Sequence, residues 1–191
     1  MPKERKQEII RAAAKRFARH GPGKTTLDEI ARDIRIGKAT IYHYFESKDE
    51  LFFASLRWEA EQFIKDIKAI FNNEELAIGA RMLEYISYKE NVDVRYKLLF
   101  DLLLQLVNDD SFEKEKLILT DLLKKEEEII KLVLGSIYSS RVVGMNESLP
   151  NFIVTSSWGA FFSNKVNQIV NKDRVVKTRD LVFKSLENIL S

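Results

Sequence analysis

Apolar residues recur at helical spacing along almost the whole chain, and this spacing constrains the fold more than any other feature of the sequence. The 191 residues include only 7 glycines and 3 prolines, and the apolar–polar alternation typical of strands is hard to find. Apolar side chains three and four positions apart lie on one face of a helix, where they can be buried together. The pattern therefore predicts an all-α fold.

Several kinds of chemistry are excluded by composition. The chain has no cysteine, which excludes disulfides, zinc fingers, iron–sulfur clusters and thiol nucleophiles. The two histidines, His20 and His43, leave little room for a transition-metal site, so we expect no metal and no cofactor. No apolar run approaches the ~20 residues that span a bilayer. The charged start, residues 1–6, differs from a secretory signal, so we expect a cytoplasmic protein that binds no membrane.

Positive charge is concentrated at the beginning of the chain. Residues 1–50 contain 12 Lys and Arg against 8 Asp and Glu, whereas the remainder has a small acidic excess and the whole chain a net charge of +2. Such a division is typical of a small module that faces nucleic acid, joined to a neutral or acidic body. Scatter among surface charges explains it equally well on this evidence alone.

The helical pattern breaks into segments with recognisable ends. A first amphipathic helix over 3–20 ends at Gly21 and Pro22, which are a typical helix stop. Thr26 with Glu29, and Ser47 with Glu50, have the spacing of capping boxes, in which the two residues satisfy each other's backbone N–H groups. Further helices are expected at about 26–34, 38–45, 48–71, 74–90, 92–107, 111–139, 148–170 and 173–190.

Residues 26–45 have the form of a helix-turn-helix, with two short helices around a turn at Ile36 and Gly37. Helices this short need support from neighbouring helices, and Phe17 and Leu51 are natural partners for their small core. The second helix then has polar side chains left for DNA. Each is ordinary on a solvated surface, and their combination favours DNA binding: Lys38, Ala39, Thr40, Tyr42 and His43, with Thr25, Thr26 and Lys48 at helix starts that suit phosphate.

The order and spacing of these residues resemble the signature of TetR-family transcriptional regulators over about residues 5–56. The residues that carry the resemblance are Phe17, Gly21, Thr25-Thr26, Glu29-Ile30-Ala31, Ile36, Lys38-Ala39-Thr40-Ile41-Tyr42, Tyr44-Phe45 and Ser47-Lys48-Asp49-Glu50-Leu51. The resemblance implies an all-helical homodimeric repressor that leaves its operator when it binds a small molecule.

The resemblance also implies a role for individual residues. Thr26, Thr40, Tyr42 and Lys48 would contact phosphates, and Lys38, Ala39, Thr40 and His43 would face bases or adjoining sugar-phosphates. This chain departs from the family pattern at two positions. Arg35 stands where the family usually has glycine and is expected in a mildly strained or phosphate-binding conformation. Gly37 stands where a Ser or Thr cap is usual, at a cost of a few tenths of a kcal/mol.

The C-terminal body is expected to supply a dimer interface. The 148–170 segment is apolar on more than one helix face, and apolar residues in the 173–190 segment recur seven apart. Such helices either close the core of one subunit or form a two-fold four-helix interface, and DNA half-sites favour the second arrangement. The interface residues we expect are Val154, Val166, Val175, Val182, Phe183 and Leu186.

Aromatic and large side chains at helical positions also predict an effector pocket, although the same pattern is common in plain cores. The apolar bias favours a hydrophobic or amphipathic small molecule. The expected lining is Phe63, Met82, Tyr85, Tyr96, Phe100, Gln105, Trp158, Phe161 and Phe162.

These features predict a DNA-binding domain over 1–47 and a helical effector-binding and dimerisation domain over 48–191, connected by helix 48–71. The predicted function is a ligand-responsive regulator, most consistent with a repressor, that binds double-stranded DNA as a homodimer. One alternative is a sequence-independent architectural DNA-binding protein, for which the charge of the first 50 residues is low. A small helical enzyme is a weaker alternative, because no nucleophile, base or phosphate-binding glycine loop is evident.

Overall fold

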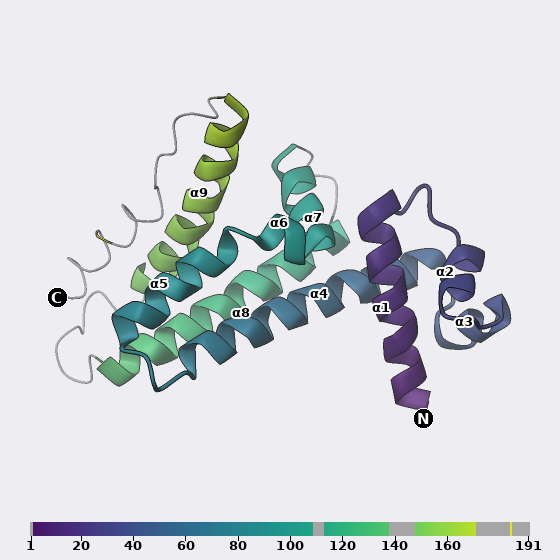
Figure 1. The fold of residues 1–191 in the computed structure, drawn as a ribbon, viewed down its shortest axis with the longest axis horizontal. Coiled ribbons are helices and arrows are strands. Elements are labelled where there is room, and N and C mark those ends of the chain that lie inside the picture. Colours follow the sequence, from purple (N-terminus) through teal and green to yellow (C-terminus); the bar gives the residue numbers. More distant parts are fainter. Residues whose placement is uncertain (1, 109–112, 138–147, 171–183, 185–191) are drawn as a thin grey trace. The chain divides into compact units, whose positions relative to one another are not determined.

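A computed structural model of the chain describes residues 2–108, 113–137, 148–170 and 184, and every regular element in this part is a helix, as predicted (Figure 1). None of the described helices is long and apolar enough to span a membrane. The elements are α1 (Pro2–His20), α2 (Leu27–Asp33), α3 (Lys38–Tyr44), α4 (Lys48–Phe71), α5 (Ile78–Lys89), α6 (Val92–Arg95), α7 (Lys97–Asn108), α8 (Glu113–Ile137) and α9 (Ser148–Val170).

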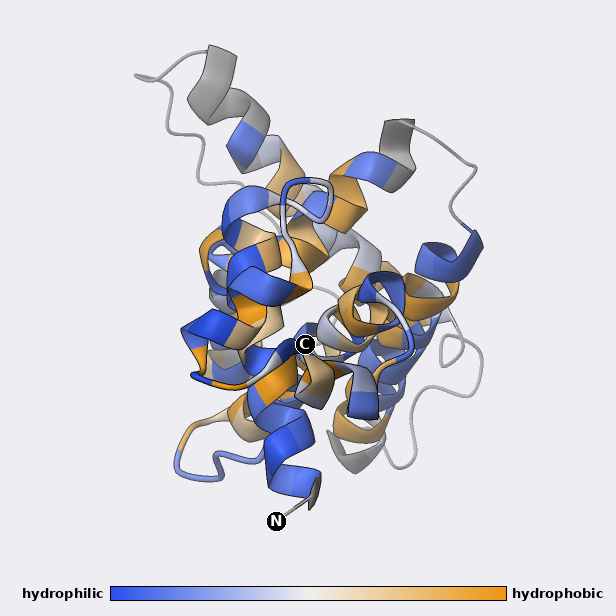
Figure 2. Ribbon diagram, turned by 90° about the vertical axis from the view of Figure 1, so that its right-hand side faces the viewer, coloured by the Kyte–Doolittle hydropathy of each residue, from blue (hydrophilic) through white to orange (hydrophobic). Residues whose placement is uncertain are grey.

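The chain divides into two compact units. Unit 1 comprises Met1–Phe63 with Asp93–Leu119, and unit 2 comprises Ile64–Val92 with Thr120–Ser191. These compact units differ from the predicted domains, 1–47 and 48–191, which were defined by expected function. The predicted domains stay a prediction. The hydropathy of the ribbon shows apolar and polar residues alternating along most helices, as amphipathic helices require (Figure 2).

Unit 1 is built around the buried face of α1. Ile9, Ala13 and Phe17 recur every four residues on this face and are at most 1% exposed. The predicted partner Leu51 is fully buried as well, and the ring of Phe17 contacts Phe52 edge-on with centroids 5.3 Å apart. The short helices contribute further buried residues to the same unit, namely Leu27, Ile30, Ala31, Ile41 and Phe45.

The helix ends of unit 1 follow the sequence signals closely. Gly21 has φ 77° and donates its N–H to the Phe17 carbonyl at 2.8 Å, which ends α1 in the left-handed conformation that glycine adopts freely. The capping box at the start of α4 is formed in part. The N–H of Glu50 donates to Ser47 Oγ at 3.0 Å, but the Glu50 carboxylate accepts from the N–H of Glu46 instead of that of Ser47.

The helix predicted over 92–107 is broken into α6 and α7 at Tyr96. Tyr96 is buried, and its ring packs edge-on against Phe63 with centroids 5.8 Å apart. Glu59 of α4 accepts the N–H of Leu99 at 3.1 Å and so satisfies a donor in the first turn of α7. The helix start is capped by a residue 40 positions earlier, which no local pattern shows.

In unit 2, α5, α8 and α9 supply most of the described core. Buried residues of α9 cover about half of its circumference, whereas Asn151, Phe152, Thr155 and Gly159 on the other half are exposed. Helix α5 begins at Ile78 rather than at the predicted residue 74. The predicted helix over 173–190 and the loop after residue 139 lie outside the described residues, apart from Lys184 and Ser148.

Candidate nucleic-acid interface

The turn between α2 and α3 has the tight geometry of a helix-turn-helix. The N–H of Arg35 donates to the Arg32 carbonyl at 3.2 Å, and that of Ile36 donates to the Ala31 carbonyl at 3.0 Å. Arg35 has φ 55°, a left-handed conformation that is strained for a residue with a side chain. The strain expected where the family usually has glycine is therefore present in the free protein.

Helix α3 has one buried face and one that faces solvent. Ile41 is fully buried and holds the helix to the unit, whereas Tyr42 is 52% exposed. Lys38, Ala39 and His43 are exposed too, and Thr40 is half-buried. Of the residues predicted to contact DNA, those on α3 other than the half-buried Thr40 therefore lie on its open face, where a helix can meet a major groove.

The two predicted DNA-contacting lysines have internal partners in the free protein. Lys38 Nζ forms an exposed ion pair with Asp28 of α2 at 2.7 Å, and the hydrogen bond to this carboxylate raises the pKa of Lys38. Lys48 Nζ donates to the carbonyl of Pro22 at 2.8 Å. Both partners are near the surface, and exposed pairs are weak. A phosphate or base can therefore replace them at small cost.

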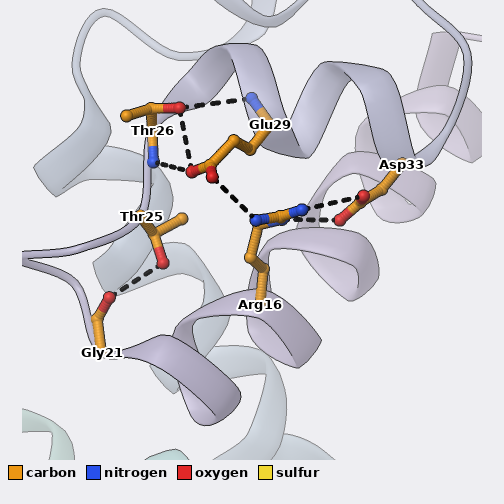
Figure 3. Close-up of polar contacts among 6 residues, drawn as sticks. All are labelled: Arg16, Gly21, Thr25, Thr26, Glu29 and Asp33. Carbon is orange, nitrogen blue, oxygen red and sulfur yellow. Dashed lines mark hydrogen bonds and ion pairs between the residues drawn. The ribbon is translucent and has the colours of Figure 1, made fainter.

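The start of α2 is held by a complete capping box (Figure 3). The N–H of Glu29 donates to Thr26 Oγ1 at 3.3 Å, and the N–H of Thr26 donates to Glu29 Oε2 at 2.9 Å, which lowers the pKa of Glu29. Arg16 of α1 joins this network through an ion pair with Glu29. It also donates two hydrogen bonds to the Asp33 carboxylate, at 2.7 and 3.1 Å, in a bidentate contact. The N-terminus predicted to meet a phosphate is thereby fixed on α1.

Thr25, in contrast, has no exposed side chain. It is 1% exposed, and its hydroxyl donates to the Gly21 carbonyl at 2.8 Å (Figure 3). Its side chain in the free protein holds the loop between α1 and α2 in place, while Thr26 faces solvent.

Sequence reasoning missed a basic groove of about 490 Å³ between α1 and the end of α2. Arg11, Lys15 and Arg19 recur every four residues along it and are exposed, and His20 lies at its end. The spacing of these cations was visible in the sequence. The groove gathers four of the N-terminal arginines and lysines, with Arg16 as the fourth, beside the carboxylates of Glu8 and Asp33.

The predicted effector-pocket residues are divided between the two units. In unit 1, Phe63 and Tyr96 are buried against each other, but Gln105 is exposed and therefore has no need of a buried partner. In unit 2, Met82, Tyr85, Trp158 and Phe161 are buried, and Phe162 is half-buried beside Phe161. Phe100 is half-buried in unit 1.

Unit 2 contains a buried polar cluster that sequence reasoning found only in part. We call it the Lys89 cluster, and it consists of Tyr85, Lys89, Glu126, Ser157 and Trp158. The Lys89 ammonium and the Glu126 carboxylate are 2.5 Å apart, and both side chains are fully buried. Burial lowers the pKa of Lys89 to about 8, and burial together with the Glu126 charge raises the pKa of Tyr85.

A signal for the missed members was present. Glu126 falls on the apolar stripe that Leu122, Ile129 and Ile130 form along α8. A charged residue on such a stripe has to be buried with a partner. Glu126 was missed because it belongs to a run of lysines and glutamates, residues 124–128, that resembles a solvated helix face.

Of the predicted interface residues, Val154 is 1% exposed and belongs to the core of unit 2, so its assignment to an interface was wrong, and Val166 belongs to α9. The remaining ones lie outside the described residues: Val175, Val182, Phe183 and Leu186.

Taken together, the two short helices, the tight turn and the solvent-facing side of α3 have the form of a helix-turn-helix. Residues 9–55 match the model of a family described as bacterial regulatory proteins, tetR family. In this segment the chain is similar to TetR-family transcriptional regulators, as the motif residues indicated.

Comparisons with individual proteins agree. A probable acrEF/envCD operon repressor of Escherichia coli K12 is 45% identical over 47 residues, which are 25% of this chain and 21% of the relative. The match spans about a third or less of the length of the curated relatives first found. These relatives are named as regulators and repressors, a non-enzymatic role.

Solved structures extend the likeness to the whole chain. A transcriptional regulator from Cytophaga hutchinsonii is 26% identical, with a TM-score of 0.65 over 95% of this chain and 92% of its own. FadR from Bacillus subtilis, in complex with stearoyl-CoA, is 17% identical, with a TM-score of 0.63 over 97% of both chains. At that identity the second match shows a shared fold.

Proposed function

We propose that this chain is a repressor that binds a palindromic operator as a homodimer and leaves it when a hydrophobic or amphipathic small molecule binds. The observation that carries the proposal is the open face of α3. Residues 1–47 would bind DNA, and residues 48–191 would bind the effector and form the dimer. The named operon repressor and the acyl-CoA-bound neighbour support the two halves of the proposal.

The DNA-binding mode follows from which groups are exposed. Tyr42 presents a phenol and Lys48 an ammonium that suit phosphate oxygens, which fix position but carry no sequence information. Lys38 lies at the first position of α3, where an ammonium released from Asp28 can donate to guanine O6 and N7. Thr26 and Thr40 add hydroxyls for phosphate, and Ala39 and His43 face bases.

The test begins with an operator selected from a random duplex library by the purified protein. Tyr42→Ala and Lys48→Ala should weaken binding to all selected sequences alike, and Lys48→Ala should reduce the salt slope of log K by about 1. Lys38→Ala should in addition change the selected base preference. Lys131→Ala, which removes an exposed lysine of unit 2, is the matched control and should change nothing.

Unchanged operator affinity in all three variants would contradict the assignment of α3. A mobility-shift assay with excess nonspecific duplex distinguishes a specific regulator from the main alternative, a sequence-independent DNA-binding protein. Binding that the competitor abolishes indicates a sequence-independent architectural protein, whereas a complex that survives indicates a specific regulator.

The dimer is supported by the exposed side of α9, where Phe152 is 46% exposed beside Thr155 and Gly159. We propose that this exposed side of α9 lies against a second copy; Val154 is buried within its own unit and does not belong to it. Analytical ultracentrifugation should show a dimer at micromolar concentration, and Phe152→Lys should shift it toward monomer. A wild-type monomer would contradict the proposal.

A further inference from the structure

The ammonium of Lys89 is enclosed by a set of groups suited to an organic cation. The Glu126 carboxylate lies at 2.5 Å and the Ser157 hydroxyl at 2.7 Å. The ring centroids of Tyr85 and Trp158 lie 4.7 and 4.5 Å away, within the range of cation–π attraction. One carboxylate, one hydroxyl and two ring faces around a positive charge make a cage of the kind that recognises ammonium ligands.

The walls of this cage are held together without Lys89. Tyr85 Oη donates to Glu126 Oε1 at 2.6 Å, and Trp158 Nε1 donates to Glu126 Oε2 at 3.0 Å. Ser157 Oγ donates to the Val154 carbonyl at 2.7 Å. Two neutral donors therefore orient the carboxylate, so it stays in position when the cation changes.

Lys89 differs from the other members of the cluster in lying at the end of a helix. It is the last residue of α5, so its backbone leads directly out of the helix. Its ammonium is attached through a flexible four-carbon stem, whereas the aromatic and carboxylate groups lie within α5, α8 and α9. The arrangement has the form of a receptor whose occupant is tethered to the chain.

We infer that the cage formed by Tyr85, Glu126, Ser157 and Trp158 is an effector subsite that takes the ammonium head of an amphipathic organic cation in exchange for Lys89. The inference rests on the proposed function and deepens it, because it names the charge of the effector. The apolar tail would lie against the large buried side chains of unit 2.

The balance of contacts favours a cation over an anion. An ammonium ligand replaces one side chain, and Glu126 keeps a positive partner, so no unpaired charge is left buried. A carboxylate ligand that took the place of Glu126 on Lys89 would break the contacts of Glu126 with Tyr85, Trp158 and Lys89. It would also leave a second carboxylate without a site.

Three probes of equal length test the charge: n-octylammonium, octanoate and octanol. Binding is followed by the fluorescence of Trp158 in a Trp58→Phe background, since the chain has 2 tryptophans and Trp58 is half-buried in unit 1. Octylammonium should bind this protein, and octanol and octanoate much more weakly. Lys89→Met removes the tethered competitor and should strengthen octylammonium binding by about tenfold or more. Glu126→Gln should abolish the preference for the cation.

The outcomes decide between an effector subsite and a purely structural ion pair. A preference for octanoate overturns the inference, as does a Lys89→Met protein that gains no affinity. The inference is also overturned if octylammonium binds the Lys89→Met protein but not the unmutated protein, because Lys89 then never leaves the cage. If Lys89→Met does not fold, as judged by circular dichroism, the comparison of the three probes on the Lys89 and Glu126→Gln proteins still decides.

A separate measurement keeps this inference distinguishable from the proposed function. Operator release is measured by fluorescence anisotropy with each probe. Cation binding without release supports the subsite and contradicts the proposed response of the repressor. Operator binding by a protein that shows no cation preference contradicts the subsite and leaves the repressor proposal standing.

Discussion

The helix-turn-helix segment and the Lys89 cluster use polar side chains in opposite ways. In the first, the pairs are exposed and closer in sequence: Thr26 and Glu29 are 3 positions apart, Lys38 and Asp28 10, and Lys48 and Pro22 26. In the second, the partners are fully or nearly buried and come from three helices. Tyr85 and Glu126 are 41 positions apart, and Lys89 and Ser157 are 68 apart.

The difference teaches what each kind of contact is suited to. Exposed pairs contribute little to stability and exchange partners easily, which suits the DNA-binding role proposed for this surface. A buried pair costs desolvation free energy, is strongly destabilising when one partner is lost, and discriminates sharply between ligands of different charge.

The largest effect should separate the two regions directly. Lys89→Met leaves Glu126 as an unpaired buried charge and should lower the free energy of unfolding by about 3–5 kcal/mol. Lys38→Met removes a cation from an exposed pair and should leave the denaturation midpoint nearly unchanged. Urea unfolding at fixed protein concentration measures both. Equal losses in the two variants would show that burial does not distinguish the regions.

Glu59 is a buried carboxylate that, unlike Glu126, has no buried ammonium beside it in the described structure, and it provides a pH test. Burial raises the pKa of Glu59 from 4.5 to about 7. The folded protein therefore binds more protons than the unfolded chain between these values, and stability falls as the pH rises through the window. Glu59→Gln should remove this fall and raise the free energy of unfolding at pH 8 by on the order of 1–3 kcal/mol.

The matched control is Glu61→Gln, on the exposed side of the same helix. It should leave the slope of stability against pH unchanged between pH 4.5 and 7. A slope that persists in the Glu59 variant would assign the pH dependence to another group.

Backbone strain in the helix-turn-helix should give a smaller effect of opposite sign. Arg35 has φ 55°, and Arg35→Gly relieves the left-handed strain, so the free energy of unfolding should rise by about 1 kcal/mol. Arg32→Gly, inside α2, is the control and should lower it by about as much. Thermal unfolding compares the two, and a loss of stability in both would mean that Arg35 makes a contact worth more than its strain.

The smallest effect concerns the start of α3. Gly37 is the N-cap, has extended φ and ψ, and offers no side-chain hydrogen bond. A Cβ at this position meets open space. Gly37→Ser should raise the free energy of unfolding by a few tenths of a kcal/mol through a new cap. Gly37→Ala stiffens the chain without an acceptor and should stabilise less than Ser does. Equal effects would show that the cap is not formed.

Local sequence predicted much of the helix-turn-helix segment because the signals that shape its helix ends act over a few positions. The stop at Gly21, the box of Thr26 and Glu29, and the strain at Arg35 all depend on neighbours within a few positions. The capping box predicted at Ser47 and Glu50 forms only in part, because the Glu50 carboxylate accepts the N–H of Glu46.

The rest could not be predicted because its partners are distant in sequence. The break at Tyr96 depends on burial of its ring against Phe63, and the start of α7 depends on a carboxylate of α4. Gln105 looked like a pocket residue because it lies among leucines, yet it is on the exposed side of α7.

The sequence by itself determined the helical class and the helix ends around the helix-turn-helix, because periodicity and capping act within one or two turns. The face of α3 that would contact DNA stays a prediction. Tertiary structure alone decided which charged residues are buried. Glu126 and Lys131 both lie on α8, but packing against α5 and α9 surrounds the first and leaves the second in solvent. The cost of desolvating a charge depends on those distant neighbours, and no local pattern contains them.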